Sequence, residues 1–175
     1  MKKMREAGFT LVELIIVVII IGILASLALP QFVTSTDDAN IATLQANIAV
    51  LRNGINLYYH QHGSTYPGVN KVDGTANGGG AGAESVDTIN QLEQYTDKDG
   101  KVSASLDRTN YPFGLYFMTG IPDNPFTGSN KIHVFAENAA LDAADVTTAT
   151  TADADCAWIY SKNTGEVRAT NSLTY

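Results

Sequence analysis

The feature that most constrains this chain is a nearly uninterrupted apolar run close to its N-terminus. Residues 14–29 read LIIVVIIIGILASLAL, and residues 9–12 add four more, mostly apolar, positions. Together they approach the roughly 20 residues that a membrane-spanning helix needs. A single segment inside a bilayer satisfies its backbone hydrogen bonds only as a helix. The sequence therefore predicts a transmembrane helix over residues 9–30.

One ionisable residue, Glu13, lies inside this apolar stretch. An unpaired carboxylate at such a depth costs on the order of 2.5–3.5 kcal/mol, and the run downstream of it contains no cation. A cut between Gly8 and Phe9 would create an α-amine, a group that ordinarily titrates near pH ~8, four residues from Glu13. That amine could pair with Glu13 in the same helix or on a neighbouring chain, and the spacing does not choose between the two.

The charge of the 175-residue chain is unevenly divided. The net charge is −7, yet residues 1–8 carry Lys2, Lys3 and Arg5 against one glutamate. This asymmetry predicts a basic N-terminus held in the cytoplasm and an acidic body outside, in the periplasm. It also disfavours a nucleic-acid partner, because phosphate binding needs a basic surface.

The residues around the expected cut resemble a known processing site. Gly8-Phe9-Thr10-Leu11-Val12-Glu13-Leu14 is similar to the N-terminal segment of type IV prepilins and type II secretion pseudopilins. The resemblance implies removal of the leader 1–8 by a prepilin peptidase, N-methylation of Phe9, and packing of residues 9–30 into a filament core. It also implies that Glu13 pairs with the amine of an adjacent subunit during assembly.

Two alternatives compete with this interpretation. An ordinary secretory signal peptide would use Ser26-Leu27-Ala28 as its cleavage site, and a plain anchor would tether a periplasmic enzyme or binding domain. Neither alternative accounts for Glu13, so we favour the prepilin interpretation.

A second helical pattern follows the apolar run. Pro30 would loosen or kink a helix, or end it, and we expect a continued helix with a weak point there. The amphipathic continuation spans residues 31–63, with Gly63 as its stop. Its buried face is expected to carry Ile41, Leu44, Ile48, Leu51, Ile55, Tyr58 and His62.

Residues 64–175 are expected to form a globular head that packs on this helix face as a small antiparallel sheet. Residues 64–83 read as a long loop, exposed where it is Gly-rich, and a short helix should follow from Ser85 to Tyr95, with Val86, Ile89 and Leu92 on one face. Strands are predicted at 113–118, 131–136, 156–161 and 166–170, the last two joined by a turn at 163–165. The fold class is therefore α+β, and the resemblance implies a pilin fold.

Other groups in the chain are weak candidates for chemistry. His60 and His62 point away from each other on a helix, and Asp97–Lys101 has only half of a calcium loop, so a solvated turn is favoured. Clustered acids between the second and third strands could bind a cation but are more simply solvated: Asp142, Asp145, Asp153 and Asp155. Cys156 is expected to be a buried free thiol. No catalytic motif is present, so we expect neither an enzyme nor a cofactor.

The head also resembles proteins similar to the major pseudopilin of type II secretion, in residues 122–128, 158–160 and 164–169. The C-terminal calcium loop of those proteins is not matched by residues 170–175, so no calcium site is carried over. The predicted function is a subunit of a homo-oligomeric pseudopilus in protein secretion. The alternative is a type IV pilus for adhesion, motility or DNA uptake. The implied partners are the prepilin peptidase and N-methyltransferase, an inner-membrane platform with its ATPase, and minor pilins or pseudopilins.

Overall fold

The computed structural model describes residues 9–75, 83–136 and 140–171, without the side chains of residues 27–35 and 83–84. Its first element, α1 (Leu11–Gln61), is a helix of 51 residues. The helix continues through Pro30, as predicted, whereas the Pro30 side chain lies outside the described part, so the weak point there stays a prediction. The chain divides into two compact units, Met1–Asn40 and Ile41–Tyr175, which are treated separately below.

Within the residues that the structure describes, no helix combines the length and the apolar character needed to cross a membrane. The predicted membrane span over residues 9–30 is therefore not confirmed.

The second unit is built around the C-terminal half of α1. The predicted face is confirmed, because Leu44, Leu51 and Ile55 are fully buried and the other members, apart from the half-buried Ile41, are nearly so. This face belongs to one apolar core together with strand and helix residues that include Leu92, Val134, Trp158, Tyr160 and Val167. The 3.6-residue period of the apolar positions thus places the helix on the head, as the sequence indicates.

The described residues of the head form two three-stranded sheets. The strands β1 (Tyr95–Thr96), β2 (Val102–Ser103) and β3 (Phe113–Gly114) form an antiparallel sheet in the order β2-β1-β3. The strands β4 (Ile132–Phe135), β5 (Trp158–Ser161) and β6 (Val167–Ala169) form a mixed sheet in the order β4-β5-β6. The α+β class is confirmed, whereas the expected strand at 113–118 is reduced to two residues and β1 and β2 were not predicted.

The prediction of a purely antiparallel sheet is wrong for β4 and β5, which pair in parallel with Ile132 opposite Trp158. The reason is the connection between them, which contains α3 (Ala143–Ala152) in a region for which no helix was predicted. Parallel neighbours need a crossover of a dozen or more residues, and a helix usually supplies it. The β5–β6 hairpin is antiparallel, as expected.

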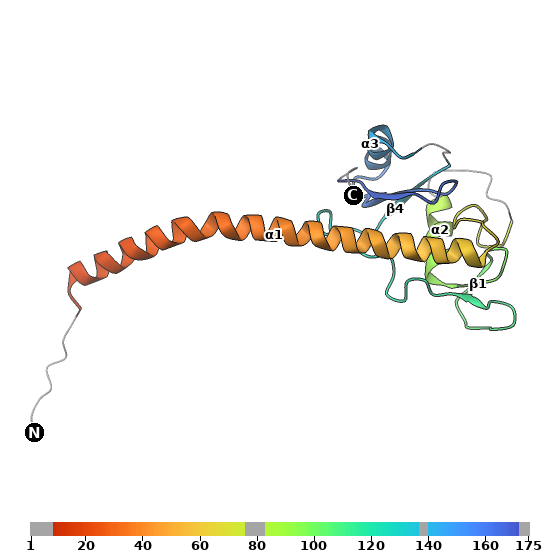
Figure 1. The fold of residues 1–175 in the computed structure, drawn as a ribbon, viewed down its shortest axis with the longest axis horizontal. Coiled ribbons are helices and arrows are strands. Elements are labelled where there is room, and N and C mark those ends of the chain that lie inside the picture. The colour runs from red at the N-terminus through yellow and green to blue at the C-terminus, as the bar shows by residue number, and fades with distance from the viewer. Residues whose placement is uncertain (1–8, 76–82, 137–139, 172–175) are drawn as a thin grey trace, which may run out of the picture. The chain divides into compact units, whose positions relative to one another are not determined.

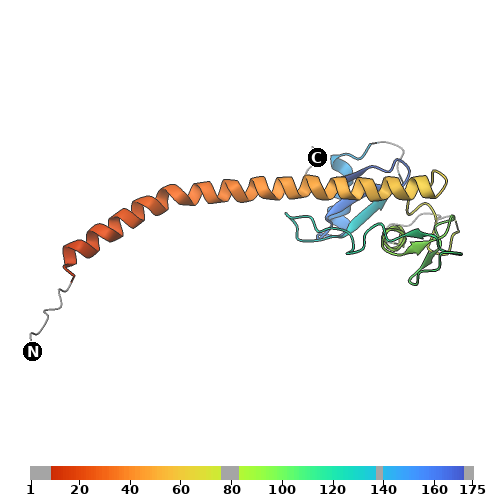
Figure 2. The same ribbon diagram turned by 60° about the horizontal axis from the view of Figure 1, so that its bottom comes forward.

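The helix α3 gives the mixed sheet a second covered face. All four residues of β5 are buried. Trp158 and Tyr160 belong to the apolar core that includes the buried face of α1. Ile159 belongs to a smaller buried cluster with Leu141 and Ala149. Figures 1 and 2 show the sheet between α3 and the C-terminal half of α1. Because side chains alternate across a strand, two buried faces require a layer on each side.

The short helix predicted after the loop is present, but one position of its predicted buried face is exposed. It is α2 (Ala83–Glu93), and Val86 is 58% exposed rather than part of a buried face. Gln91 is fully buried instead. Its amide accepts from the Gly68 N–H and donates to the carbonyl of Gly100. The inward face of α2 therefore combines Leu92 and Ile89, which pack on the core as predicted, with Gln91, which satisfies the backbone of the neighbouring loop. The Gly-rich residues 76–82 lie outside the described residues.

The N-terminus of α3 has an aspartate cap that supports a prediction. The Asp142 carboxylate accepts from the N–H groups of Ala144 and Asp145 at 2.7 and 3.2 Å, and the Asp145 carboxylate accepts from the Asp142 N–H at 2.8 Å. Asp142→Ala is expected to cost about 1 kcal/mol of unfolding free energy. Asp142→Asn keeps an accepting oxygen and should stay within a few tenths of wild type. Urea unfolding of both variants measures the difference, and an equal loss in the two would contradict the capping role.

Candidate functional site

The start of α1 holds the residues that the sequence singles out. The Glu13 carboxylate accepts from both the N–H and the hydroxyl of Thr10, at 2.8 Å each, and the Thr10 hydroxyl accepts from the Glu13 N–H at 3.3 Å. Thr10 is therefore the N-cap of the helix and Glu13 its third residue, which is a reciprocal capping box. Sequence reasoning assigned no role to Thr10, although the Thr-x-x-Glu pattern is its recognisable signal.

The capping box fixes where the carboxylate of Glu13 lies. Thr10 occupies one carboxylate oxygen, Oε2, with two donors. An ionised carboxylate offers about four lone-pair positions over two oxygens, so the group keeps capacity for a cation. Among the described residues no cation pairs with Glu13. Phe9, with which the mature chain would begin, is 86% exposed just before the cap.

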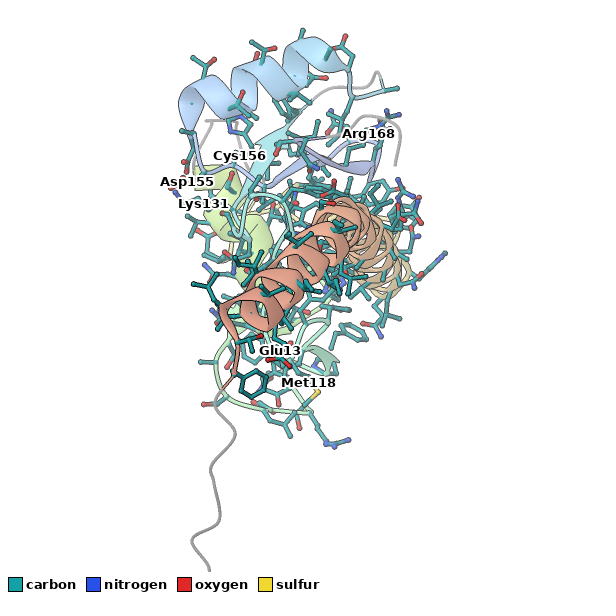
Figure 3. All side chains as sticks on the ribbon, turned by 90° about the vertical axis from the view of Figure 1, so that its left-hand side faces the viewer. Glu13, Met118, Lys131, Asp155, Cys156 and Arg168 are labelled. Atoms are coloured by element: carbon teal, nitrogen blue, oxygen red, sulfur yellow. The ribbon has the colours of Figure 1, made fainter. Side chains whose placement is uncertain are left out.

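The helix beyond Glu13 presents apolar side chains around its whole circumference. Every described side chain from residue 9 to residue 26 is exposed. Among them are isoleucines and valines with about half of their surface accessible, such as Ile15, Val17 and Ile20. An apolar surface of this extent requires a cover, either of lipid or of other protein helices. Figure 3 places Glu13 at the exposed beginning of the same helix.

The remaining processing residues cannot be placed. Gly8, Lys2, Lys3 and Arg5 belong to residues 1–8, which lie outside the described residues. Their roles stay predictions.

The acidic candidates in the head have structural partners. Asp142 and Asp145 cap α3, while Asp153 and Asp155 pair with Lys131 at 2.9 and 3.4 Å. Asp97 accepts from the N–H groups two and four residues ahead, so its segment forms a turn. Across the described part of the chain, no three His, Cys, Asp or Glu residues are grouped so that they could hold a metal.

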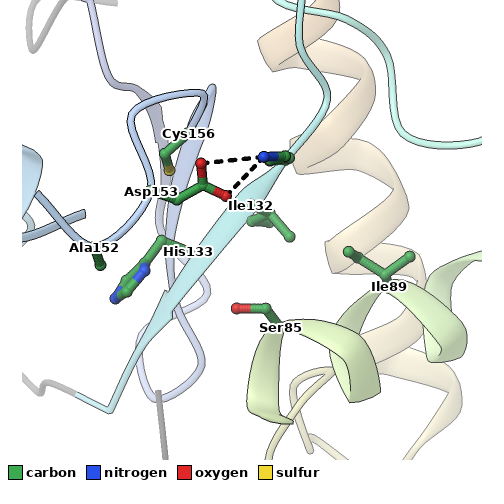
Figure 4. A pocket seen from close by; sticks show the side chains of 8 residues that line it. Ser85, Ile89, Ile132, His133, Ala152, Asp153 and Cys156 are labelled. Atoms are coloured by element: carbon green, nitrogen blue, oxygen red, sulfur yellow. Dashed lines mark hydrogen bonds and ion pairs between the residues drawn. The ribbon is translucent and has the colours of Figure 1, made fainter. Parts of the chain in front are cut away.

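Cys156 lies in the wall of a pocket of about 380 Å³ between α2, β4 and the end of α3 (Figure 4). The thiol is 2% exposed and contacts the carbonyl of Trp158, which confirms the predicted buried free cysteine. Burial raises the pKa of Cys156 to about 11, so the thiol is protonated and unreactive at neutral pH. In the same pocket Asp153 forms an ion pair with Lys131 at 2.9 Å.

The turn at residues 122–128, which resembles a segment of pseudopilin heads, is hydrogen-bonded to the mixed sheet. Asn124 is fully buried, and its side chain donates to Ala157 O and to Asn171 Oδ1. The indole of Trp158 donates to the carbonyl of Pro122 at 2.9 Å. These residues therefore position the turn at 122–128 against the mixed sheet.

The two histidines of α1 have different surroundings. His60 is exposed, whereas His62 is 4% exposed and stacks on Tyr58 with ring centroids 3.7 Å apart. His62 contacts the carbonyl of Tyr58 at 2.8 Å and the hydroxyl of Thr96 at 3.0 Å. Burial lowers the pKa of His62, although Asp97 opposes the shift. The histidine is therefore a core residue and no ligand partner of His60.

This burial predicts a pH-dependent stability of the head. The unfolded chain binds a proton at His62 near pH ~6.5, whereas the folded chain resists it, so stability falls as the pH drops from 7 towards 5. His133, whose pKa burial also lowers, adds to the same trend. His62→Gln should remove part of the slope while His133→Gln removes another part. Urea midpoints of the detergent-solubilised chain at pH 7.5 and 5.5 measure it; an unchanged slope in His62→Gln would refute the assignment.

Comparison with known proteins points to the N-terminal segment. The prokaryotic N-terminal methylation motif matches residues 3–29. The chain is 55% identical over 49 residues to the type IV narrow pilus major component PilA5 of Thermus thermophilus, covering 28% of this chain and 42% of that protein. It is 40% identical over 68 residues to the type II secretion system core protein G of Vibrio cholerae, covering 38% and 46%. The predicted resemblance to pilins and pseudopilins is thereby confirmed.

A longer match extends into the head. A fimbrial protein of Neisseria meningitidis is 32% identical over 106 residues, which covers 60% of this chain and 58% of that protein. The chain thus spans about half the length of the curated relatives named here. No solved structure matches the chain. The relatives divide between pilus components and secretion-system components.

Proposed function

We propose, on the premise that this chain is a member of the pilin and pseudopilin family, that it is the precursor of a non-enzymatic filament subunit. A prepilin peptidase removes residues 1–8 by cutting after Gly8, and the new amine of Phe9 is methylated. The mature subunits then polymerise through their N-terminal helices. The observation that carries this proposal is the capping box of Thr10 and Glu13, which holds a carboxylate directly beside the expected new terminus.

Before assembly, the apolar start of α1 lies in the inner membrane, with the N-terminus cytoplasmic and the acidic head periplasmic. The charge division of the chain supports this orientation. The exposed apolar side chains of residues 9–26 exchange lipid contacts for contacts with neighbouring helices. The carboxylate of Glu13 keeps hydrogen-bonding capacity beyond Thr10 and accepts the amine of an adjacent subunit. An assembly platform, its ATPase and minor subunits are the expected partners.

We favour a pseudopilus of type II secretion as the filament. The head segments at 122–128, 158–160 and 164–169 resemble the major pseudopilin, and the chain has a single, buried cysteine rather than the cysteine pair of many adhesive type IV pilins. The similarity to core protein G of Vibrio cholerae supports the same choice. The second candidate is a type IV pilus, which the similarity to a pilus component of Thermus thermophilus favours.

Mass spectrometry of the native protein tests the processing scheme. We expect the mature chain to begin at a methylated Phe9, whereas a start at Met1 or Leu29 would refute the processing scheme.

Deletion of the gene distinguishes between the pseudopilus and the pilus. Loss of exported proteins from the medium, with surface pili intact, supports the pseudopilus; loss of surface pili with normal secretion supports the pilus.

A further inference from the structure

An exposed apolar patch lies on the head, along the C-terminal half of α1. It consists of Val50 and Leu57, which are 48% and 50% exposed, and of Met118, which is 84% exposed. Met118 is labelled in Figure 3. We call these three residues the Leu57 patch. None of them belongs to the apolar core of the head.

Helix geometry places the two α1 residues of the patch beside the segment that follows β3. Val50 and Leu57 come four residues before and three residues after Gly54, so the three positions share one side of the helix. The ring of Phe117 lies directly over Gly54. Met118 is the next residue along the chain, and its side chain is exposed whereas that of Phe117 is buried. The members of the patch therefore surround the place where the Phe117 ring enters the core.

The segment that carries Met118 is fixed to α1 on both sides of the patch. Before Met118, the Tyr116 hydroxyl donates to Gln61 Oε1 at 2.6 Å. After it, the carbonyl of Asp123 accepts from the side-chain amide of Asn47 at 2.8 Å. Because contacts within the chain hold this surface in place, a partner need not order it on binding.

The two chain segments that form the Leu57 patch carry almost no charge. Residues 109–122 contain no Asp, Glu, Lys or Arg, and residues 41–61 contain only Arg52. Arg52 lies on the other side of α1, where its guanidinium donates to the carbonyl of Val167 in β6. In the centres of protein–protein interfaces charged residues are depleted, whereas methionine and aromatic residues are enriched. The composition of this surface therefore suits contact with another protein chain.

The charge of the whole chain indicates which protein that is. Copies with a net charge of −7 repel one another, and like charges brought together at a contact cost affinity. Contacts between copies are therefore favoured where a copy presents an uncharged face. A lipid surface fits less well, because apolar surfaces that bind membranes are typically flanked by several basic residues.

We propose that the Leu57 patch is the surface through which the head of one subunit contacts the next copy of this chain. The inference rests on the filament function proposed above and adds a head contact to the packing of the N-terminal helices. Open filaments are built from heterologous contacts, so the patch meets a different surface of the neighbouring head rather than a second Leu57 patch.

An introduced thiol tests whether the patch is covered in filaments. Met118→Cys places it in the patch, while the native Cys156 is only 2% exposed. We expect a maleimide to react with Met118→Cys about tenfold or more slowly in purified filaments than in detergent-dispersed full-length subunits, because a packed contact excludes solvent. The matched control is Thr148→Cys on the exposed face of α3, which should react at equal rates in both.

Three outcomes of the labelling experiment would overturn the proposal. Equal rates for Met118→Cys in filaments and in dispersed subunits would show that no neighbouring copy covers the patch. Equal slowing of Met118→Cys and Thr148→Cys would show a general shielding of the heads. Slow labelling of Met118→Cys in membranes but not in purified filaments would assign the patch to lipid or to a different protein.

A charge placed in the patch tests its role in assembly. Met118→Glu adds a carboxylate at an exposed position, so its melting curve should match wild type while filament yield falls about tenfold or more. Val86→Glu makes the same change at an exposed apolar side chain of α2 and should assemble like wild type. Wild-type yield from Met118→Glu, or an equal loss in Val86→Glu, would refute the head contact. The filament proposal fails separately, if the wild-type chain forms no filaments.

Discussion

Replacing Glu13 by alanine is expected to leave a subunit that is processed normally but does not assemble. The proposed cut between Gly8 and Phe9 lies outside the capping box, so the mature chain should still begin at Phe9. If Glu13 accepts the amine of a neighbouring subunit, as proposed above, that amine would be left without its partner in the filament. An amine that loses its partner where subunits pack disfavours every subunit contact, so we expect filament yield to fall about tenfold or more. Filament yield in sheared or overexpressed preparations measures the effect.

Two further variants separate the roles of this region. Glu13→Gln can still reach back to Thr10 as a capping residue but carries no charge, so it should assemble as poorly as Glu13→Ala. Gly8→Ala is the opposite control, because it should leave an uncut precursor while Glu13 is intact. Wild-type filament yield from Glu13→Gln would show that capping, and not charge, is what the carboxylate supplies.

Of the two residues of the capping box, the sequence predicted Glu13 and not Thr10. The anomaly of Glu13 was visible because a charge in an apolar run needs a partner. Thr10 was not predicted, although the Thr-x-x-Glu pattern is visible in the sequence. The pattern indicates a capping box only when the helix is known to begin directly after the threonine. The sequence therefore identified Glu13 as a functional residue but not Thr10, the residue that orients its carboxylate.

In the head, local periodicity was a better guide than composition. The buried face of α1 followed from its spacing, and the β5–β6 hairpin followed from its turn. The direction of β4 relative to β5 was predicted wrongly because it depends on α3, whose residues are mostly Ala and Thr with one Asp. The helix is stabilised here by the Asp142 cap and by Ala149, which lies in one buried cluster with Ile159. The direction of β4 relative to β5 thus depends on tertiary packing, which the local sequence does not show.

A final prediction concerns the contact that holds the segment after β3 on α1. Gly54 is a buried helical glycine, and a Cβ atom there would overlap the ring of Phe117, which is 6% exposed. Gly54→Ala gains about 1 kcal/mol from helix propensity. It must also displace a packed ring, and overpacking of this kind costs about 1–3 kcal/mol. The ring overlap is severe, so we expect net destabilisation by Gly54→Ala and a loss of about 3 kcal/mol or more for Gly54→Leu.

A change of sign in a double variant makes this prediction specific. In a Phe117→Ala background the obstructing ring is absent, so Gly54→Ala should stabilise the head by about 1 kcal/mol instead of destabilising it. Chemical unfolding of the two single variants and the double variant gives the coupling energy between the two positions. If Gly54→Ala changes stability by the same amount in both backgrounds, the ring does not occupy the space above Gly54. A coupling of about 2 kcal/mol or more would mean that the helix requires a glycine there to seat Phe117.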